Sequence, residues 1–276
     1  MVRNVWGRLH NDYLLADRRG DYRALLELAE AGGYRVMTVG AWRDLRRSGA
    51  PLTGADRRIL IMRHDIDTAP HVARMYAEEE ERVGGRGSYF FRLQTADLRV
   101  MRDIAGAGHE VGYHYEELAT VAKERGVNGK DRVDGILGEA RERFVRNLTM
   151  LRQRTGLPLR AAASHGDFAN RALDASNTLL LADPALRERA GIDLEAYDPE
   201  IEDGLEFRAI DTPYPHFWRQ GKDPAAAIRA GLGPMLVLTH PRQWGRNWYW
   251  NAREDLKRLG EGVLFNAGLP QVWRRA

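Results

Sequence analysis

The chain of 276 residues contains no cysteine. This absence excludes disulfide bonds, thiolate metal ligands and a cysteine nucleophile, so any metal must be held by His, Asp or Glu. No apolar run approaches the roughly 20 residues of a membrane span, and the first ten residues lack the apolar core of a signal peptide. We therefore expect a soluble, cytoplasmic protein without a membrane span.

An excess of charge of one sign is also missing. The 42 basic and 39 acidic residues leave a net charge of only +3, and the two signs are mixed along the chain. Proteins that bind nucleic acid usually show a concentrated basic footprint, so we expect no nucleic-acid partner. Apolar residues make up 43% of the chain, enough for a sizeable core. We expect one catalytic domain over 1–276, with a helical extension (1–57) packed on a barrel core (58–260).

Short apolar runs alternate with longer amphipathic stretches. The runs predict strands at 34–39, 58–62, 88–93, 109–115, 159–164, 206–210 and 235–239. The stretches predict helices at 21–31, 42–47, 70–83, 96–107, 132–155, 225–230 and 252–259, with one or two more in 170–190. This alternation predicts an α/β fold with about seven mostly parallel strands, in a barrel or a doubly wound sheet. In either case the site should lie at the C-terminal ends of the strands.

Four of the eight histidines lie at or near the ends of predicted strands, namely His64, His114, His165 and His240. Parallel strands deliver such residues to one edge of a sheet, so we expect all four to converge on one cavity. His109 lies at the start of its strand, and we expect it to be structural, with Glu110 as a possible partner.

Two acids, Asp65 and Asp67, follow His64 with one apolar residue between them. At a strand end they point the same way, and two adjacent carboxylates repel each other unless a cation is present. A divalent metal resolves this, because one acid ligates it while the other stays free as a base. The structural alternative is that they cap the helix expected from residue 70, although a cap needs only one acid.

The other strand ends carry polar and aromatic side chains. His165, beside Gly166, suits metal binding or catalysis, and an aromatic stretch (244–250) follows His240 directly. Its tryptophans either form a stacking wall for a sugar ring or pack against the rim. Arg92 either binds an anionic group or pairs with a buried acid. The residues expected to contact substrate are Arg92, Tyr113, Asp211, Trp244 and Trp248.

At these residues the sequence resembles the polysaccharide deacetylase superfamily, the NodB-homology group of carbohydrate esterases. The resemblance covers about 58–259 and is closest to a branch with a His-Asp-x-Asp first motif. It implies a deformed (β/α) barrel that removes acetyl groups from sugars with a divalent metal, usually zinc. It also implies that Asp65 is the general base, Asp67 a metal ligand and His240, in Leu-x-His, the general acid.

Two further roles follow from the same resemblance. The segment that matches Gly-His-Glu-x-Gly-x implies that His114 is the first ligand histidine, and Arg160 stands for the arginine of the third motif. The family's second ligand histidine is replaced here by Leu118. We expect His165 to supply the third ligand, with Glu116 and Glu117 as alternatives.

The sequence therefore predicts a deacetylase in which Asp67, His114 and His165 hold one divalent ion, most simply zinc. Its substrate would be a sugar or another acylated small molecule. Two rival functions stay open: a metal hydrolase acting on a different small amide, and a carbohydrate-binding protein that kept the fold but lost catalysis.

Overall fold

The computed structural model describes residues 9–14, 16–245 and 247–271. The chain divides into two compact units. Unit 1 comprises Met1–Gly112 and Asp198–Asn251, and unit 2 comprises Tyr113–Tyr197 and Ala252–Ala276. The single catalytic domain over 1–276 stays a prediction.

Unit 1 holds most of the strands. They are β1 (Arg35–Met37), β2 (Ile59–Ile66), β3 (Ser88–Phe91), β7 (Phe207–Ile210), β8 (Met235–Thr239) and the first half of β4 (Glu110–Tyr115). The helices are α2 (Arg19–Ala31), α3 (Val39–Arg47), α4 (Val72–Arg82), α5 (Leu98–Gly106), α11 (Pro199–Glu202) and α12 (Pro224–Arg229). Short helical turns are η1 (His10–Leu14), η2 (Gly54–Arg57), η3 (Leu93–Thr95), η5 (Arg219–Gly221) and η6 (Pro241–Gln243).

The strands of unit 1 are hydrogen-bonded in the order β4-β3-β2-β8-β7, and β1 also pairs with β2. The pairs of β2 with β1, β3 and β8, and of β7 with β8, are parallel. Every residue of β2 and of β8 is buried, as expected for central parallel strands that are covered on both faces. The extension predicted over 1–57 therefore contributes a strand, β1, as well as helices.

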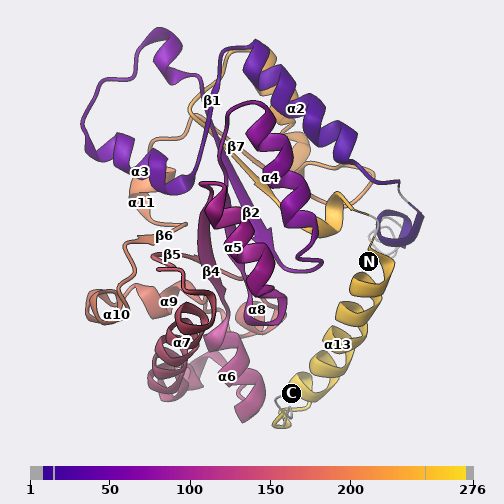
Figure 1. The fold of residues 1–276 in the computed structure, drawn as a ribbon. Helices are drawn as coiled ribbons and strands as arrows, with labels where there is room; N and C mark the ends of the chain where they lie inside the picture. The colour runs from indigo at the N-terminus through magenta and orange to yellow at the C-terminus, as the bar shows by residue number, and fades with distance from the viewer. Residues whose placement is uncertain (1–8, 15, 246, 272–276) are drawn as a thin grey trace. The chain divides into compact units, whose positions relative to one another are not determined.

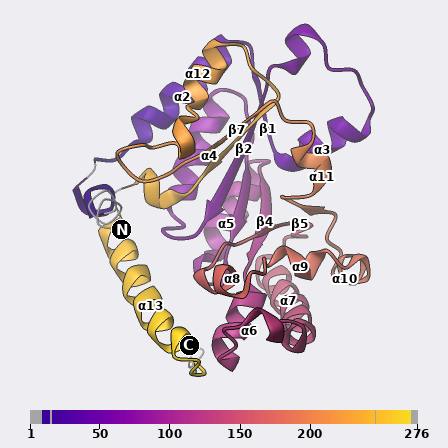
Figure 2. The same cartoon turned by 180° about the vertical axis from the view of Figure 1, so that it is seen from behind.

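Helix α2 packs beside both α4 and α12 (Figures 1 and 2). Its buried residues, Tyr22, Leu25, Leu26 and Ala29, recur at helical spacing and form its apolar face. Helix α12 is capped by Asp223, whose side chain accepts a hydrogen bond from the backbone of Ala225. Its first residue is Pro224, a residue type favoured in the first turn of a helix.

Unit 2 contains the second half of β4, β5 (Ala161–Ser164) and β6 (Leu194–Glu195), paired in parallel in the order β4-β5-β6. Its helices are α6 (Glu117–Arg125), α7 (Asp134–Thr155), α8 (Phe168–Leu173), α9 (Thr178–Leu181), α10 (Pro184–Ala190) and most of α13 (Trp248–Asn266), with the turn η4 (Lys130–Arg132). Helix α6 packs against α7 and α8 (Figure 2).

The predicted α/β class with about seven mostly parallel strands is confirmed: the predicted strands are β1 to β5, β7 and β8, and the described residues add an eighth strand, β6. About seven parallel strands is also the number expected for the deformed (β/α) barrel that the resemblance implied. The helices α6 and α11 and the short strand β6 were not predicted, and three helices, α8, α9 and α10, lie where one or two were expected in 170–190. Helix α6 buries residues on nearly all its sides, including Glu117, Leu118 and Lys123, so its sequence lacks the one-sided apolar stripe that marks an amphipathic helix. Among the described residues, no helix is long and apolar enough to cross a membrane.

Candidate active site

In unit 1, the C-terminal ends of β2 and β8 bring Asp65 and His240 to one edge. His64 pairs with Thr239 in the parallel register, so the residue after each, Asp65 and His240, leaves the two strands at the same level. Of the four histidines expected to converge at strand ends, His240 lies at this edge with Asp65; the catalytic roles of the two residues stay predictions.

Asp65 is held by a neighbour that the sequence analysis did not single out. Arg63 donates from Nε and Nη2 to the two carboxylate oxygens of Asp65, at 2.9 Å each. The side chains of Arg63 and Asp65 are 0% and 3% exposed. Residues two apart on a strand point to the same face, so the spacing carried this signal. The bidentate pair fixes the orientation of the Asp65 carboxylate.

His240 is held by Asp211, which follows β7. The ring Nδ1 of His240 donates to Asp211 Oδ1 at 2.6 Å, and its backbone N–H donates to Oδ2 at 2.7 Å. The indole Nε1 of Trp244 donates to the same Oδ2 at 2.8 Å. Asp211 and Trp244 were expected to contact a sugar. In the structure Asp211 holds the His240 ring, and Trp244 holds Asp211.

The charge of Asp211 decides the protonation of His240. Burial disfavours the imidazolium and lowers the pKa, but the charge and hydrogen bond of Asp211, helped by the charges of Asp67 and Asp65, outweigh it and raise the pKa to about 9. His240 is therefore a cation at neutral pH and suits the role of a general acid.

We expect the ring resonances of His240 to titrate with a midpoint near pH 9 in an NMR titration. The ion pair with Asp211 stabilises the fold fully below the unfolded pKa of about 6.5 and loses that contribution as pH rises through about 9. Asp211→Asn should lower the midpoint markedly, because burial is then opposed only by the smaller effects of Asp67 and Asp65. The exposed Asp203 of the same unit offers the control Asp203→Asn, and a midpoint unchanged in Asp211→Asn would contradict the assignment.

His64 does not join this edge. Its side chain is fully buried, with Nδ1 2.6 Å from Thr239 Oγ1 and Nε2 2.7 Å from Glu80 Oε1. Glu80 also accepts hydrogen bonds from the hydroxyls of Tyr22 (2.8 Å) and Tyr89 (2.6 Å). His64 is therefore part of a buried structural network on the other face of β2.

His109 belongs to the same network, as expected for a structural histidine. Its partner is Glu80, with His109 Nδ1 3.3 Å from Glu80 Oε2, whereas Glu110 binds the side chain of Ser88 and the backbone of Gly40. Burial raises the pKa of Glu80, but His64, His109 and Tyr89 together lower it to about 2.

Glu80→Gln should destabilise the protein by about 2–3 kcal/mol at pH 7, because the buried donors lose the negative charge and one of the two acceptor oxygens. The depressed pKa means that Glu80 contributes stability above about pH 4.5, and that this contribution is lost as pH falls through about 2. The control is Glu78→Gln on the same helix, where a half-exposed pair with Arg19 should contribute under about 1 kcal/mol. Urea unfolding measures both, and equal losses would show that the buried network adds nothing.

Arg92 and Asp67 also lie in unit 1. Arg92 is 2% exposed, and its Nη1 donates to the backbone oxygen of Asp67 at 3.4 Å. Arg92 therefore braces the chain at Asp67 and does not present an exposed guanidinium. Trp248, expected to stack on a sugar, is 61% exposed at the start of α13.

In unit 2, two histidines come together at the ends of β4 and β5. The rings of His114 and His165 lie edge to face with centroids 5.1 Å apart. His114 Nδ1 donates to the backbone oxygen of Ala163 at 2.9 Å. This bond places the lone pair on Nε2, the arrangement seen in metal-binding histidines.

Acidic side chains surround His165. Its Nδ1 lies 3.0 Å from Glu116 Oε2, and ligand atoms of Glu116, His165 and Asp167 all lie within 4.8 Å of one another. Imidazole and carboxylate are the donors that zinc and similar cations take in proteins without thiolates. The donor set of unit 2 therefore fits a divalent cation.

Asp167 was not predicted, and its oxygens already have partners. Oδ1 accepts from the backbone of Ala169 at 2.8 Å, as the N-cap of α8, and Oδ2 accepts from Lys123 Nζ at 3.1 Å. Lys123 also donates to Glu261 at 2.8 Å. Burial lowers the pKa of Lys123, but the charges of Asp167, Glu116 and Glu261 outweigh it and raise it. Asp167 is thus a weaker candidate ligand than His114, His165 or Glu116.

Glu117, the other alternative ligand, is occupied within unit 2. Its Oε1 accepts from the hydroxyl of Tyr113 and from Asn147 Nδ2, the latter at 2.8 Å. Burial raises the pKa of Glu117 more than these hydrogen bonds lower it. Tyr113, expected to contact substrate, is 1% exposed, so Tyr113 and Glu117 form a buried structural pair.

The structure does not bring Arg160 to this group. Arg160 precedes β5 at its N-terminal end, whereas His165 follows the C-terminal end of the same strand. Its guanidinium is 59% exposed and lies 3.2 Å from Asp193. Within the described chain, the arginine that binds Asp65 is Arg63.

Comparison with known proteins yields structural similarity alone. No family model matches the chain, and no curated protein matches it. Among solved structures, a mutant of BA3943 described as a CE4 family pseudoenzyme with restored enzymatic activity has a TM-score of 0.38 and 13% identity. Wild-type BA3943 from Bacillus anthracis, described as a CE4 family pseudoenzyme, has a TM-score of 0.39 and 12% identity.

Each match covers 74% of this chain, and 64% and 62% of the respective BA3943 chains. The aligned part is thus less than two thirds of either protein. At TM-scores of 0.38 and 0.39 and identities of 13% and 12%, the structural similarity does not assign the chain to a family.

Proposed function

We propose that the protein is a divalent-metal-dependent hydrolase that removes an acetyl group from a sugar or a sugar-containing small molecule. The observation that carries the proposal is the acid–base edge of unit 1. There Asp65, oriented by Arg63, and His240, kept protonated by Asp211, follow paired residues of β2 and β8. A carboxylate base and an imidazolium acid are the two proton-transfer groups that hydrolysis of an amide requires.

In this proposal Asp65 accepts a proton from the attacking water. His240 then donates a proton to the leaving amine as the carbon–nitrogen bond breaks. Asp211 and Trp244 keep the His240 ring in place between these steps. Each proton transfer of this kind contributes roughly 10²–10⁴-fold to the rate.

His114 and His165 would hold the metal in unit 2, and the sequence predicts Asp67 of unit 1 as the remaining ligand, with Glu116 as an alternative. A bound divalent ion, zinc in the simplest case, would supply a water of lowered pKa and polarise the acetyl carbonyl.

The test pairs elemental analysis with acetate release from N-acetylated and O-acetylated sugars. About one divalent ion per chain and chelator-sensitive release of acetate would support the proposal. Acetate release from small amides but not from sugars would favour the metal hydrolase of another amide. The proposal would be overturned if the protein held no divalent ion and released no acetate, even after incubation with zinc.

A second candidate is a carbohydrate-binding protein without catalysis. Two observations favour it: Leu118, fully buried, takes the place of the usual ligand histidine, and Lys123 already places a cation against Asp167. Binding of sugars that is unaffected by chelator and by Asp65→Asn would support this candidate over the hydrolase.

A further inference from the structure

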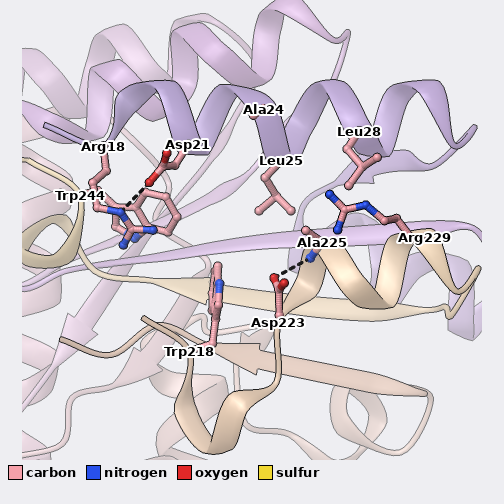
Figure 3. A pocket seen from close by; sticks show the side chains of 10 residues that line it. All are labelled: Arg18, Asp21, Ala24, Leu25, Leu28, Trp218, Asp223, Ala225, Arg229 and Trp244. Atoms are coloured by element: carbon pink, nitrogen blue, oxygen red, sulfur yellow. Dashed lines mark hydrogen bonds and ion pairs between the residues drawn. The ribbon is translucent and has the colours of Figure 1, made fainter. Parts of the chain in front are cut away.

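A groove lies between α2 and α12 in unit 1 (Figure 3). Its volume is about 370 Å³, within the range of small-molecule sites. Leu25 and Leu28 of α2 form one wall, and Trp218 and Trp244 close one end. The lining is thus an apolar and aromatic surface with a few charged groups at its rim.

One of these charges has no ion-pair partner within the part of the chain that the structure describes. Arg18 is bound to Asp21 through Nε at 2.8 Å, and Asp223 accepts from the backbone of Ala225 at the start of α12. Arg229 reaches over the groove from the other end of α12 (Figure 3), and no ion pair to it is present among the described residues. An anionic group on a ligand would balance this charge.

The aromatic end of the groove is built into the support of His240. Arg18 donates its backbone N–H to the carbonyl of Trp244 at 2.8 Å, and its guanidinium lies 4.4 Å from the centre of the Trp244 ring. Trp244 in turn donates to Asp211, which holds His240. The groove is therefore placed directly behind the residues that orient the proposed acid.

We propose that this groove is an accessory binding site for an acidic sugar, a pyranose that carries a carboxylate or a phosphate. The sugar ring packs against Trp218 and the leucines of α2, because the C–H face of a pyranose suits an indole wall. The anionic group binds Arg229. The choice of a sugar rests on the proposed function; the anionic group rests on Arg229 alone.

In the test, the full chain is titrated with glucuronate, glucose 6-phosphate, glucose and acetate. Binding of each compound is measured by calorimetry and by tryptophan fluorescence. We expect saturable binding of at least one acidic sugar, weaker binding of glucose, and none of acetate. The tighter of the two acidic sugars identifies the anionic group. Arg229→Gln should weaken the binding of acidic sugars about tenfold, because one charge-assisted contact is lost. The affinity for glucose should be unchanged.

Arg99→Gln is the matched control, since Arg99 is an exposed arginine on α5 of the same unit. Equal binding of acidic sugars to Arg229→Gln and wild type would overturn the proposal, as would equal binding of glucose and glucuronate. Acetate binding as tightly as glucuronate would reduce the groove to a simple anion site. Binding is measured without turnover, so a failure of the proposed hydrolysis leaves this result separately interpretable.

Discussion

Asp65→Asn should release acetate about 10²–10⁴-fold more slowly than the wild type, while retaining its bound metal. The amide has the shape of the carboxylate but accepts no proton from water. The bound metal should be unaffected, because Asp65 is engaged by Arg63 and is not among the proposed ligands. The measurement is acetate release under saturating substrate, beside elemental analysis of the same preparation.

The same substitution leaves Arg63 buried without its carboxylate, which typically costs about 3–5 kcal/mol of stability. Activity must therefore be expressed per folded molecule, from circular dichroism at the assay temperature. Asp103→Asn, which breaks an exposed pair with Arg74, serves as the control and should keep full activity. Turnover of folded Asp65→Asn near the wild-type rate would show that another group is the base.

His114→Ala and His165→Ala should each lose bound metal, with affinity more than about 100-fold weaker than wild type, since even partners of metal ligands are worth 10–100-fold. The physical reason is that each removes an imidazole donor from the ring pair at the ends of β4 and β5. Elemental analysis after equilibration with a weak chelator measures the loss. Asp67→Ala tests the ligand predicted from unit 1 in the same way.

Two glutamates of unit 2 provide the comparison. Glu117→Gln should keep the metal, because Tyr113 and Asn147 occupy that carboxylate. Glu116→Gln distinguishes the two candidate ligands, His165 and Glu116. If Glu116→Gln retains the metal and His165→Ala loses it, His165 is the ligand. If Glu116→Gln loses the metal and His165→Ala retains it, Glu116 is the ligand. Metal retained in all of these variants would place the site elsewhere.

The strand pattern and the strand-end histidines were accessible from the sequence because both depend on short local signals. Apolar runs at 58–62 and 235–239 predicted two buried parallel strands, and the structure extends the first to Ile66. Histidines after these runs were then expected at one edge: His240 follows β8 there, level with Asp65, whereas His64 turns inward to Glu80. The helix predicted at 252–259 is present but longer than predicted, since α13 runs over Trp248–Asn266.

The partners of these residues were not accessible in the same way. Arg63 and Asp65 differ by two positions, but a charged pair buried at 0% and 3% exposure depends on the strands that cover it. Asp211 pairs with His240 from 29 positions away, and Glu261 reaches Lys123 from 138 positions away. No periodicity within one segment encodes these last two contacts, which join segments far apart in the sequence.

The sequence by itself determined the α/β class, the parallel strands, the absence of thiol chemistry and the residues whose chemistry suits hydrolysis, because composition and local periodicity specify these. The tertiary structure decided which of those side chains are buried against which partners. It turned His64 inward to Glu80, placed Asp211 and Trp244 behind His240, and engaged Glu117 with Tyr113. The physical reason is that the protonation and orientation of a buried polar group depend on neighbours brought from distant segments by packing.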